Sequence, residues 1–557
     1  MPLMKKLSTY LMVAILLTAS PAAGENSWPW GHVMKHLNPR SEPLVDSDLI
    51  HAIPLGVGPI VECGDFLEPK ISLDTGDLSV DIYFGFSSSF ANNTIYLLGK
   101  NSRFHPLSHG LVPYKTSISG KIELVPLEAI SKKDLPAGTY KLYLLLTPAG
   151  KLQAGYILWV TSFKVGQDKQ KEYKWKLWQS GPNLRGANVY QRRVYEELDD
   201  GLLGTGPIGP PYSQEDFNRL ARLGANYVNL SHPGLYSEDP PYILDPEVQK
   251  NLDEFIEMAR KADLFVVIAF RTGPGRSDFS ILREGAGNWF PHHYIKDDVW
   301  KDPVAQDAWV EMWKYTAQRY KDDPIVVGYD LMVEPNSNDI VGMDSPAQFY
   351  AAYTNSTYDW NLLYPRIERA IRQVDPDTPI LIQANGYSSI EWHKWLKRPN
   401  CDKIIISVHQ YEPFEFTHQE FENARFSYPG RIDLDWDGEE DNFDTGWLDS
   451  FLDQIDSISS RTSLPVAVTE FGAMRWVSGA ADFLNDEMAF FEKTGANYAI
   501  WLWESSWSPY VKEVNCFNFR FGTDPLNKQD IDGNELMQVV ETYWKKNIMK
   551  PTTLLEK

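Results

Sequence analysis

The segment IVVGYDLMVEPN at residues 325–336 joins a continuous apolar run to an acid. The run is short and rich in β-branched and aromatic residues, as expected of a strand that is buried on both faces. Glu334 comes at the end of this segment and Pro335 follows it directly, so the strand should end there. A carboxylate in such a place must have a partner or a task, because burying it alone is costly.

Seven other runs of this kind occur along the chain, and helical segments separate them. The helices begin with ordinary signals, such as an N-cap at Ser213 and a first-turn proline at Pro246 and Pro303. Buried strands that alternate with helices indicate a parallel sheet, and eight such units indicate a closed (β/α)8 TIM barrel. An open doubly wound sheet is the alternative, but no glycine-rich phosphate loop follows the first run. The eight runs are LRGANV (184–189), NYVNL (226–230), LFVVIAF (264–270), IVVGYDLM (325–332), PILIQA (379–384), KIIISVH (403–409), LPVAVTE (464–470) and NYAIWLW (497–503).

The N-terminal third has a different pattern. LSVDIYFGF (78–86) alternates apolar and other residues, and further strand-like segments follow between Pro and Gly turns. We therefore expect an all-β sandwich, with a charged boundary segment at 166–176. The predicted organisation is a signal peptide (1–24), an N-terminal extension (25–49), a β-sandwich accessory domain (50–168) and the barrel domain (169–557).

The first 24 residues resemble a secretory signal peptide, with two Lys, a short apolar stretch and small residues before the expected cleavage site. We expect a secreted or periplasmic monomer without a membrane span. The net charge of −22 disfavours nucleic acid as a partner. Three widely spaced Cys allow at most one disulfide and leave one Cys unpaired.

Two acids stand at the ends of predicted barrel strands. Glu334 ends the fourth and Glu470 ends the seventh, so both should face the mouth of the barrel, where TIM-barrel active sites lie. Two carboxylates that share one cleft are what glycosidic bond cleavage requires. The alternative is that each acid forms a salt bridge with an arginine, such as Arg271 or Arg475; for the pair we favour the catalytic interpretation.

Several motifs at the strand ends resemble glycoside hydrolase family 5, whose members are retaining (β/α)8-barrel glycosidases. The resemblance extends over roughly residues 180–510 and does not include the N-terminal β domain. HQYEPFEFTHQ is its most specific part. The motifs are GYDLMVEPN (328–336), IISVHQYEPFEFTHQ (405–419), LPVAVTEFG (464–472) and AIWLWES (499–505).

The resemblance implies a role for five residues. Glu334 is the expected acid/base and Glu470 the expected nucleophile, with His409 and Tyr411 steadying Glu470. Trp503 is the expected stacking floor beside the scissile bond, with Trp501 as the second choice.

The chemistry of a retaining glycosidase adds conditions. The two carboxyls should lie about 5–5.5 Å apart. Glu334 should be protonated, and we expect partial desolvation and a neighbouring anion to raise its pKa. Glu470 should be ionised, and a tyrosine hydroxyl that donates to it favours that form.

The sequence departs from the family pattern near the sugar 2-hydroxyl. Val333 stands where the family has a sugar-binding Asn, and Asn229 and Arg271 stand where it has Arg and His. We predict a divergent member in which Asn229, His232, Arg271 or Asn385 contacts the 2-hydroxyl.

The chemistry needs no metal or organic cofactor. DLDWDGEEDNFD (433–444) approaches a calcium-binding loop, but its last ligand position is Asp rather than Glu. A solvated acidic loop is the favoured interpretation and structural Ca²⁺ the alternative.

We therefore predict a glycosidase that cleaves a β-linked polysaccharide or oligosaccharide by double displacement. β-1,4-Glucan is the first candidate substrate and mannan the second. The alternative is a catalytically inactive carbohydrate-binding protein on a barrel scaffold.

Overall fold

The computed structural model describes residues 66–67, 71–91, 93–127, 130–131, 135–136, 138–151, 156–165, 172–399 and 401–555. The predicted signal peptide and N-terminal extension lie outside these residues. The chain divides into two compact units, Met1–Asp168 with Asn400–Asp402 and Lys169–Pro399 with Lys403–Lys557. Each unit has a hydrophobic core of its own.

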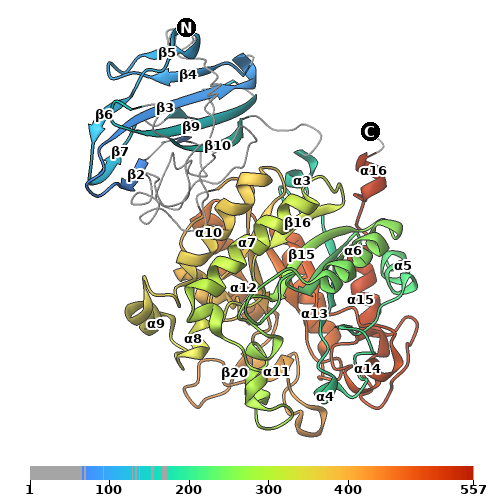
Figure 1. Cartoon of the computed structure of the whole chain (residues 1–557). Coiled ribbons are helices and arrows are strands. Elements are labelled where there is room, and N and C mark those ends of the chain that lie inside the picture. Colours follow the sequence, from blue (N-terminus) through green and yellow to red (C-terminus); the bar gives the residue numbers. More distant parts are fainter. Residues whose placement is uncertain are drawn as a thin grey trace. The chain divides into compact units, whose positions relative to one another are not determined.

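Apart from two short 3₁₀ helices, the regular elements in the described residues of the first unit are β-strands, which agrees with the predicted all-β fold. Its main sheet is antiparallel with the order β10–β9–β3–β4–β5, and β6 pairs with β3 (Figure 1). The antiparallel pair β2–β7 contributes Leu73 and Ile122 to the core on one face of β3, where Val80, Ile82 and Phe84 lie. The alternation of apolar residues in 78–86 thus correctly predicted the buried face of β3. The strands are β1 (Phe66–Leu67), β2 (Ile71–Asp74), β3 (Val80–Ser88), β4 (Ile95–Leu98), β5 (Phe104–Pro106), β6 (Lys115–Ile118), β7 (Lys121–Leu124), β8 (Ile130–Ser131), β9 (Gly138–Pro148) and β10 (Ile157–Val165). The 3₁₀ helices η1 (Ser89–Ala91) and η2 (Leu107–His109) follow β3 and β5.

The second unit is the predicted parallel barrel. Eight strands close in the order β11–β14–β15–β16–β17–β18–β21–β22, and every neighbouring pair is parallel. Each strand coincides with one of the eight apolar runs, because strands buried on both faces have no polar alternation. The strands are β11 (Arg185–Tyr190), β14 (Tyr227–Pro233), β15 (Phe265–Thr272), β16 (Val326–Asp330), β17 (Ile380–Gln383), β18 (Ile404–Gln410), β21 (Val466–Phe471) and β22 (Asn497–Ile500).

Helices cover the outside of the barrel (Figure 1). Ser213 forms a capping box with Asp216 at the start of α5, and Asp245 and Asp302 cap α6 and α7 just before the predicted first-turn prolines. In the described part of the connection between β17 and β18, the 3₁₀ helix η9 (Ile390–Trp395) stands in place of an α-helix. The longer helices are α5 (Gln214–Arg222), α6 (Pro246–Lys261), α7 (Pro303–Tyr320), α10 (Trp360–Val374), α12 (Thr445–Thr462), α13 (Ala480–Thr494) and α15 (Glu535–Trp544).

Shorter elements lie in the connections and at the ends of this unit. They include α3 (Glu172–Lys176), β12 (Arg192–Arg193), α4 (Glu196–Asp199), β13 (Ile208–Gly209), η5 (Asp278–Ser280), η6 (Arg283–Gly285), η7 (His292–Tyr294), η8 (Asp298–Trp300), α8 (Ser337–Ile340), α9 (Pro346–Tyr353), α11 (Phe414–Thr417), η10 (Phe421–Asn423), β19 (Gly430–Ile432), β20 (Asp441–Phe443), α14 (Ser508–Glu513), η11 (Phe519–Phe521) and α16 (Pro551–Leu555).

Aromatic and aliphatic side chains close the N-terminal end of the barrel. Trp178 and Leu177 pack there against Tyr227 and Phe265, which begin their strands. The indole N–H of Trp178 donates to the carbonyl of Val327 at 2.9 Å. The opposite end of the barrel, where the strands terminate, is therefore the end that can hold a site.

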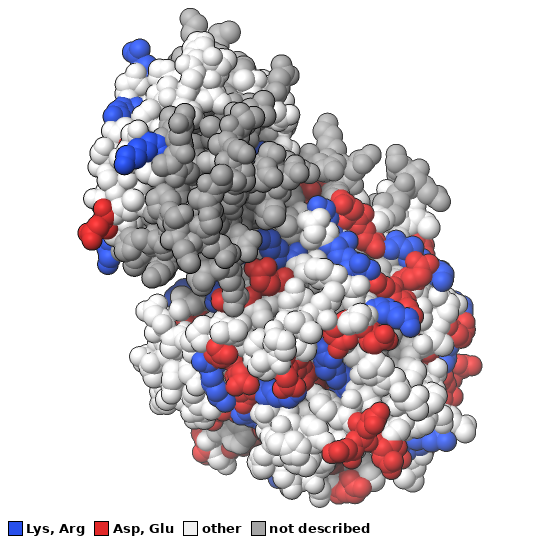
Figure 2. Space-filling view, viewed as in Figure 1, with Lys and Arg blue, Asp and Glu red and all other residues white. Residues whose placement is uncertain are grey.

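The surface charge, the helices and the cysteines can also be compared with the sequence predictions. Lys and Arg are intermixed with Asp and Glu on the visible face of the barrel unit (Figure 2). Among the described helices, none is both long and apolar enough to cross a bilayer. Cys401 is disulfide-bonded and Cys516 is a free thiol, whereas Cys63 lies outside the described residues.

Candidate active site

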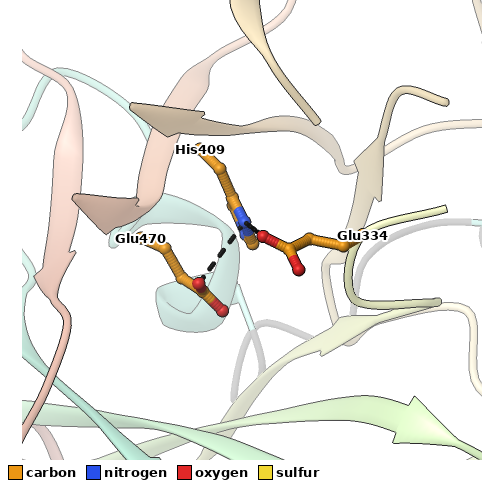
Figure 3. Close-up of side chains that lie close together, drawn as sticks. All are labelled: Glu334, His409 and Glu470. Atoms are coloured by element: carbon orange, nitrogen blue, oxygen red, sulfur yellow. Dashed lines mark hydrogen bonds and ion pairs between the residues drawn. The ribbon is translucent and has the colours of Figure 1, made fainter. Parts of the chain in front are cut away.

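The two predicted acids meet at the mouth of the barrel. Glu470 lies within β21 and is buried, with 3% of its surface exposed. Glu334 comes four residues after the end of β16 rather than at its last residue, because the strand stops at Asp330. One oxygen of Glu334, one oxygen of Glu470 and a ring nitrogen of His409 all lie within 4.8 Å of one another (Figure 3).

The backbone of Glu334 has a left-handed conformation, with φ of +53°. Such a conformation costs a non-glycine residue of order 1–3 kcal/mol and persists where its surroundings hold it. Here the Glu334 N–H donates to Gln383 Oε1 at 2.7 Å, and its carbonyl accepts from Arg276 Nη2 at 2.5 Å. Arg276 is fully buried and also donates to the carbonyl of Val333 at 2.7 Å. The acid is therefore fixed by its backbone as well as by its side chain.

His409 contacts both acids. Its Nδ1 lies 3.0 Å from Glu334 Oε1 and 3.5 Å from Glu470 Oε2. The hydroxyl of Tyr411 donates to Glu470 Oε2 at 3.1 Å. Tyr411 thus occupies the place the sequence predicted. His409 lies closer to Glu334 than to Glu470, whereas the family resemblance implied a role beside Glu470.

The pKa shifts of the two acids are the reverse of those expected from the sequence. Burial raises the pKa of Glu470 to about 7, and the charge of Glu334 adds to the rise, although His409, Arg271 and Tyr411 oppose it. Burial alone would also raise the pKa of Glu334, but the hydrogen bond and charge of His409, with Arg271 and Arg276, hold it below its ordinary value. The prediction of a raised pKa for Glu334 is therefore wrong for the free site, because it omitted the contact with His409.

His409 carries the compensating charge. Burial lowers the pKa of His409, but the charges of Glu470 and Glu334 and the hydrogen bond to Glu334 outweigh burial, so the net shift is upward. A proton held on His409 Nδ1 lies within hydrogen-bonding distance of Glu334.

Arg271 is part of the same site. Its Nη1 lies 3.8 Å from Glu470 Oε1, and its Nε donates to Asp278 Oδ1 at 3.0 Å. The guanidinium lies over the rings of Tyr190 and Trp501, at 5.2 and 5.4 Å from their centroids. Asp278 also accepts from the hydroxyl of Tyr190 at 2.5 Å, so the carboxylate that binds Arg271 is itself held in place.

The choice of Trp503 as the stacking floor is wrong. Its indole N–H donates to the carbonyl of Asp216 at 3.0 Å, the guanidinium of Arg520 covers its ring at 4.6 Å, and 1% of its surface is exposed. A ring used in this way has no free face for a sugar. Trp501 is partly exposed and packs edge-on to Tyr190, with Arg271 over its ring.

Of the four residues predicted to contact the sugar 2-hydroxyl, Asn229, His232 and Asn385 are fully buried. Asn229 Nδ2 donates to Asn188 Oδ1 at 2.8 Å, and His232 Nε2 pairs with Asn251 Oδ1 at 2.8 Å. Asn385 Oδ1 accepts from the backbone N–H of Ser337 at 2.9 Å. These side chains order the barrel interior and its loops, which leaves Arg271 as the member of the four that lies beside the carboxylates.

Sequence reasoning missed Tyr190, Asp278, Arg276 and Gln383. Gln383 is the last residue of β17, and a polar residue at a strand end is a signal by which the sequence could have revealed it. Asp278 and Arg276 lie in the loop after β15, and nothing in their local sequence indicates that they hold Arg271 and Glu334. Val333 is fully buried, so its apolar side chain faces packing atoms.

The acidic loop after β18 carries a cluster of carboxylates. One oxygen each of Asp433, Asp435 and Asp441 lie within 4.8 Å of one another. Asp433 also accepts from the backbone N–H groups of Asp437 and Gly438, at 3.1 and 3.0 Å. The carboxylates converge as a calcium loop requires, and they also cap their own loop, as they would in an ion-free acidic turn.

The sequence matches the profile of the family described as "Cellulase (glycosyl hydrolase family 5)" over residues 201–506. This stretch contains Glu334, His409, Glu470 and Trp501 and most of the barrel.

Proteins of similar sequence include an endoglucanase and a beta-xylosidase. Endoglucanase C of Acetivibrio thermocellus is 24% identical over 233 residues, which are 40% of this chain and 59% of that protein. A beta-xylosidase of Phanerodontia chrysosporium is 26% identical over 207 residues, which are 37% of this chain and 38% of that protein. The chain thus spans less than two thirds of the length of both relatives. The crystal structure of endoglucanase Cel5A from Thermotoga maritima matches 67% of this chain and 99% of that one, with 20% identity and a TM-score of 0.46.

Proposed function

Because the chain belongs to glycosyl hydrolase family 5, we propose that it hydrolyses β-linked polysaccharides or oligosaccharides by a retaining double displacement. The observation that carries this proposal is the pair Glu334 and Glu470, with oxygens within 4.8 Å of each other at the mouth of the barrel. Retaining glycosidases have their two carboxyls about 5–5.5 Å apart, whereas inverting ones need about 6.5–9.5 Å to admit a water. The short separation supports retention.

In the first step, Glu470 attacks the anomeric carbon while Glu334 gives a proton to the departing glycosidic oxygen. The C–O bond to the leaving sugar breaks, and an ester bond forms between the remaining sugar and Glu470. In the second step, Glu334 takes a proton from water, the water oxygen attacks the same carbon, and Glu470 leaves as a carboxylate.

His409 supplies the protonation state that the first step needs. The pKa of His409 is raised by the two acids, and when its ring is protonated Nδ1 donates to Glu334 Oε1, 3.0 Å away. Transfer of that proton makes Glu334 the acid and leaves His409 neutral, while Glu470 stays ionised. Tyr411 and Arg271 stabilise the negative charge of Glu470 before it attacks.

The sugar beside the scissile bond stacks on Trp501 and lies next to Arg271. The guanidinium is fixed by Asp278 through Nε and its Nη1 lies 3.8 Å from Glu470, so its Nη groups can donate to a sugar hydroxyl bound beside the nucleophile. Arg271 therefore takes the part of the sugar-binding Asn that Val333 replaces.

β-1,4-Glucan is the first candidate substrate, because a related protein is named an endoglucanase. Mannan is the second, because glucose and mannose differ at the 2-hydroxyl and Val333 offers no amide to distinguish them. We also propose that the protein acts as a secreted or periplasmic monomer without a catalytic metal, on the basis of its N-terminal sequence and of the chemistry.

A substrate panel with matched variants tests the proposal. The wild-type protein should hydrolyse one or more of soluble β-glucans, mannans and aryl β-glycosides. Glu470→Gln and Glu334→Gln should each lower kcat by at least about 10³-fold on natural substrates, since each removes one of the two reacting groups. On an aryl substrate with a good leaving group, Glu334→Gln should lose less, because the proton is then hardly needed.

Glu368→Gln is the control, because Glu368 is a buried acid on α10. It should retain full kcat. If Glu470→Gln keeps its activity, the assignment of the nucleophile is wrong. If the wild-type protein binds β-glycans and cleaves none of the panel, the chain is the alternative, a carbohydrate-binding barrel.

A further inference from the structure

A third buried carboxylate lies directly behind the active site. Asp330 is the last residue of β16 and has no exposed surface. Its Oδ2 accepts two hydrogen bonds, from Gln383 Nε2 at 2.9 Å and from Ser407 Oγ at 3.2 Å. The two donors come from the next two strands of the barrel, β17 and β18.

The first of these bonds leads to Glu334. Gln383 Nε2 donates to Asp330, and its Oε1 accepts from the backbone N–H of Glu334 at 2.7 Å. A side-chain amide can make both bonds in one orientation only, since its nitrogen donates and its oxygen accepts. Asp330, which is an acceptor, therefore fixes the orientation in which Gln383 holds Glu334.

The second bond leads to Glu470. Ser407 Oγ lies 2.5 Å from Thr469 Oγ1, and Thr469 directly precedes Glu470 in β21. A hydroxyl has one hydrogen, so when Asp330 is ionised and Ser407 donates to it, Thr469 donates to Ser407. The direction of this chain of hydrogen bonds is thus also set by the acceptor on Asp330.

The remaining polar atoms of this layer have no partner within the described residues. Asp330 Oδ1 and His409 Nε2 are both buried and without a hydrogen bond there. Burial raises the pKa of Asp330 to about 7, against its bonds to Gln383 and Ser407 and the charge of His409, and in its ionised form Asp330 adds to Glu470 and Glu334 in raising the pKa of His409. The carboxylate is thus linked to Glu334, to the strand of Glu470 and to His409.

We propose that Asp330 is a positioning residue that holds both catalytic glutamates, Glu334 through Gln383 and the strand of Glu470 through Ser407 and Thr469. This inference rests on the proposed function. Asp330 touches neither the substrate nor the reacting atoms, and it acts by presenting one oxygen to two donors. An error of about 1 Å in the position of a reacting group can cost about 10²-fold in rate.

Two substitutions separate the acceptor from the charge. Asp330→Asn can keep an oxygen on Gln383 and Ser407, with its amide nitrogen at the position of the unpartnered Oδ1. Asp330→Leu has the same branched shape, with bulkier methyl groups and no acceptor. We expect Asp330→Leu to lower kcat about 10²-fold with KM within about threefold, and Asp330→Asn to retain kcat within about tenfold.

Asp375→Leu is the matched control. Asp375 is also fully buried and accepts from the Tyr329 hydroxyl at 2.9 Å and from two backbone N–H groups, but it precedes β17, at the opposite end of the barrel. It should lower the melting temperature and leave kcat of the folded protein unchanged. Each variant is assayed below its own melting temperature, so that loss of fold is not scored as loss of turnover.

A double-mutant cycle tests whether Asp330 acts on Glu334 through Gln383. Gln383→Leu and Asp330→Leu break the same link to Glu334, so their effects on kcat should be far from additive. Ser407→Ala, the milder change on the other branch, should lower kcat about threefold to tenfold on its own.

An active Asp330→Leu variant would overturn the inference, and so would equal losses in Asp330→Leu and Asp330→Asn, or additive losses in the cycle with Gln383→Leu. These outcomes are distinct from failure of the proposed function, in which the wild-type protein itself cleaves no β-glycan.

Discussion

Trp501 and Trp503 are two residues apart after β22, yet their rings have different surroundings. Trp503 is enclosed by Arg520 and bound to the carbonyl of Asp216, whereas Trp501 is partly exposed beside Arg271. Alternation along a strand places both rings on the same face, so the sequence offers no way to choose between them. The choice depends on how the chain bends beyond Ile500, where β22 ends.

Substitution of the two tryptophans should separate binding from stability. Trp501→Ala should lower kcat/KM on oligosaccharides at least tenfold and change the melting temperature little, because it removes a partly exposed ring beside the carboxylates. Trp503→Ala should cost about 3–5 kcal/mol of unfolding free energy, as for other large core residues. Steady-state kinetics and urea unfolding of both variants check this, and equal kinetic losses would show that Trp501 has no special part in binding.

The pH dependence of kcat/KM should reflect the raised pKa of Glu470. Glu470 must be ionised to attack, and its pKa in the free protein is about 7. The rate constant kcat/KM should therefore rise as the pH increases towards about 7, since this parameter reports on the free enzyme. Because the charge of His409 lowers that pKa, His409→Phe should move the rising limb to higher pH. Profiles from pH 4 to 10 on an aryl glycoside check the prediction, and a limb that stays in place or moves down would contradict it.

The contact between His409 and both acids could not be predicted from the sequence. The register of β18 against β21 shifts between Val408 and His409, so that His409 lies beside Glu470. Such irregularities redirect side chains near active sites and leave no local sequence signal. The two acids themselves were predictable, because a carboxylate near the end of a continuous apolar run is conspicuous, even though β16 ends four residues before Glu334 and β21 one residue after Glu470.

At the scale of elements, the connection after β22 contains a buried acid that the proposed reaction does not use. Glu504 has no exposed surface, and neither of its carboxylate oxygens has a hydrogen-bond partner within the described residues. Burial raises its pKa to about 8, against the opposing charge of Arg520, whose Nη2 donates to the backbone carbonyl of Glu504 at 3.1 Å. The acid is therefore protonated in the folded protein at neutral pH.

Glu504→Gln should stabilise the protein in a pH-dependent way. The pKa of Glu504 is higher in the folded protein than in the unfolded one. Its contribution to the stability of the wild-type protein is therefore complete below about pH 4.5 and is lost as the pH rises towards 8. At pH 7 the loss amounts to roughly 3 kcal/mol, which Gln avoids. Between pH 4.5 and 7, the melting temperature of the variant should rise relative to that of the wild type. Glu415→Gln is the control, because Glu415 is a half-buried residue of α11. A constant difference across that range would contradict the account.

The eight barrel strands could be predicted and the helical layer only in part. Continuous apolar runs mark doubly buried strands directly, and prolines and N-cap residues mark the starts of α5, α6 and α7. The 3₁₀ helix η9 between β17 and β18 breaks the expected alternation, and its sequence IEWHKW has no feature that sets it apart from a short α-helix.

At the scale of the molecule, the chain comprises two units with separate cores. We expect scanning calorimetry to show two unfolding transitions, because units with separate cores need not unfold together. An oligosaccharide ligand at about 100 times its Kd should stabilise the transition of the barrel unit by about 2.7 kcal/mol and leave the other unchanged. A single transition that moves as a whole with ligand would show that the two units unfold as one.

If Glu470 is the nucleophile, it forms a covalent bond with the sugar, and that bond can be trapped. A 2-deoxy-2-fluoro β-glycoside with a dinitrophenolate leaving group, built on the sugar that the active protein prefers, should give a glycosyl-protein that persists, because the fluorine slows its hydrolysis. Mass spectrometry of the digested protein should place the added mass on Glu470, and Glu470→Gln should acquire none. An adduct on any other carboxylate, or an active protein that forms none, would contradict the account.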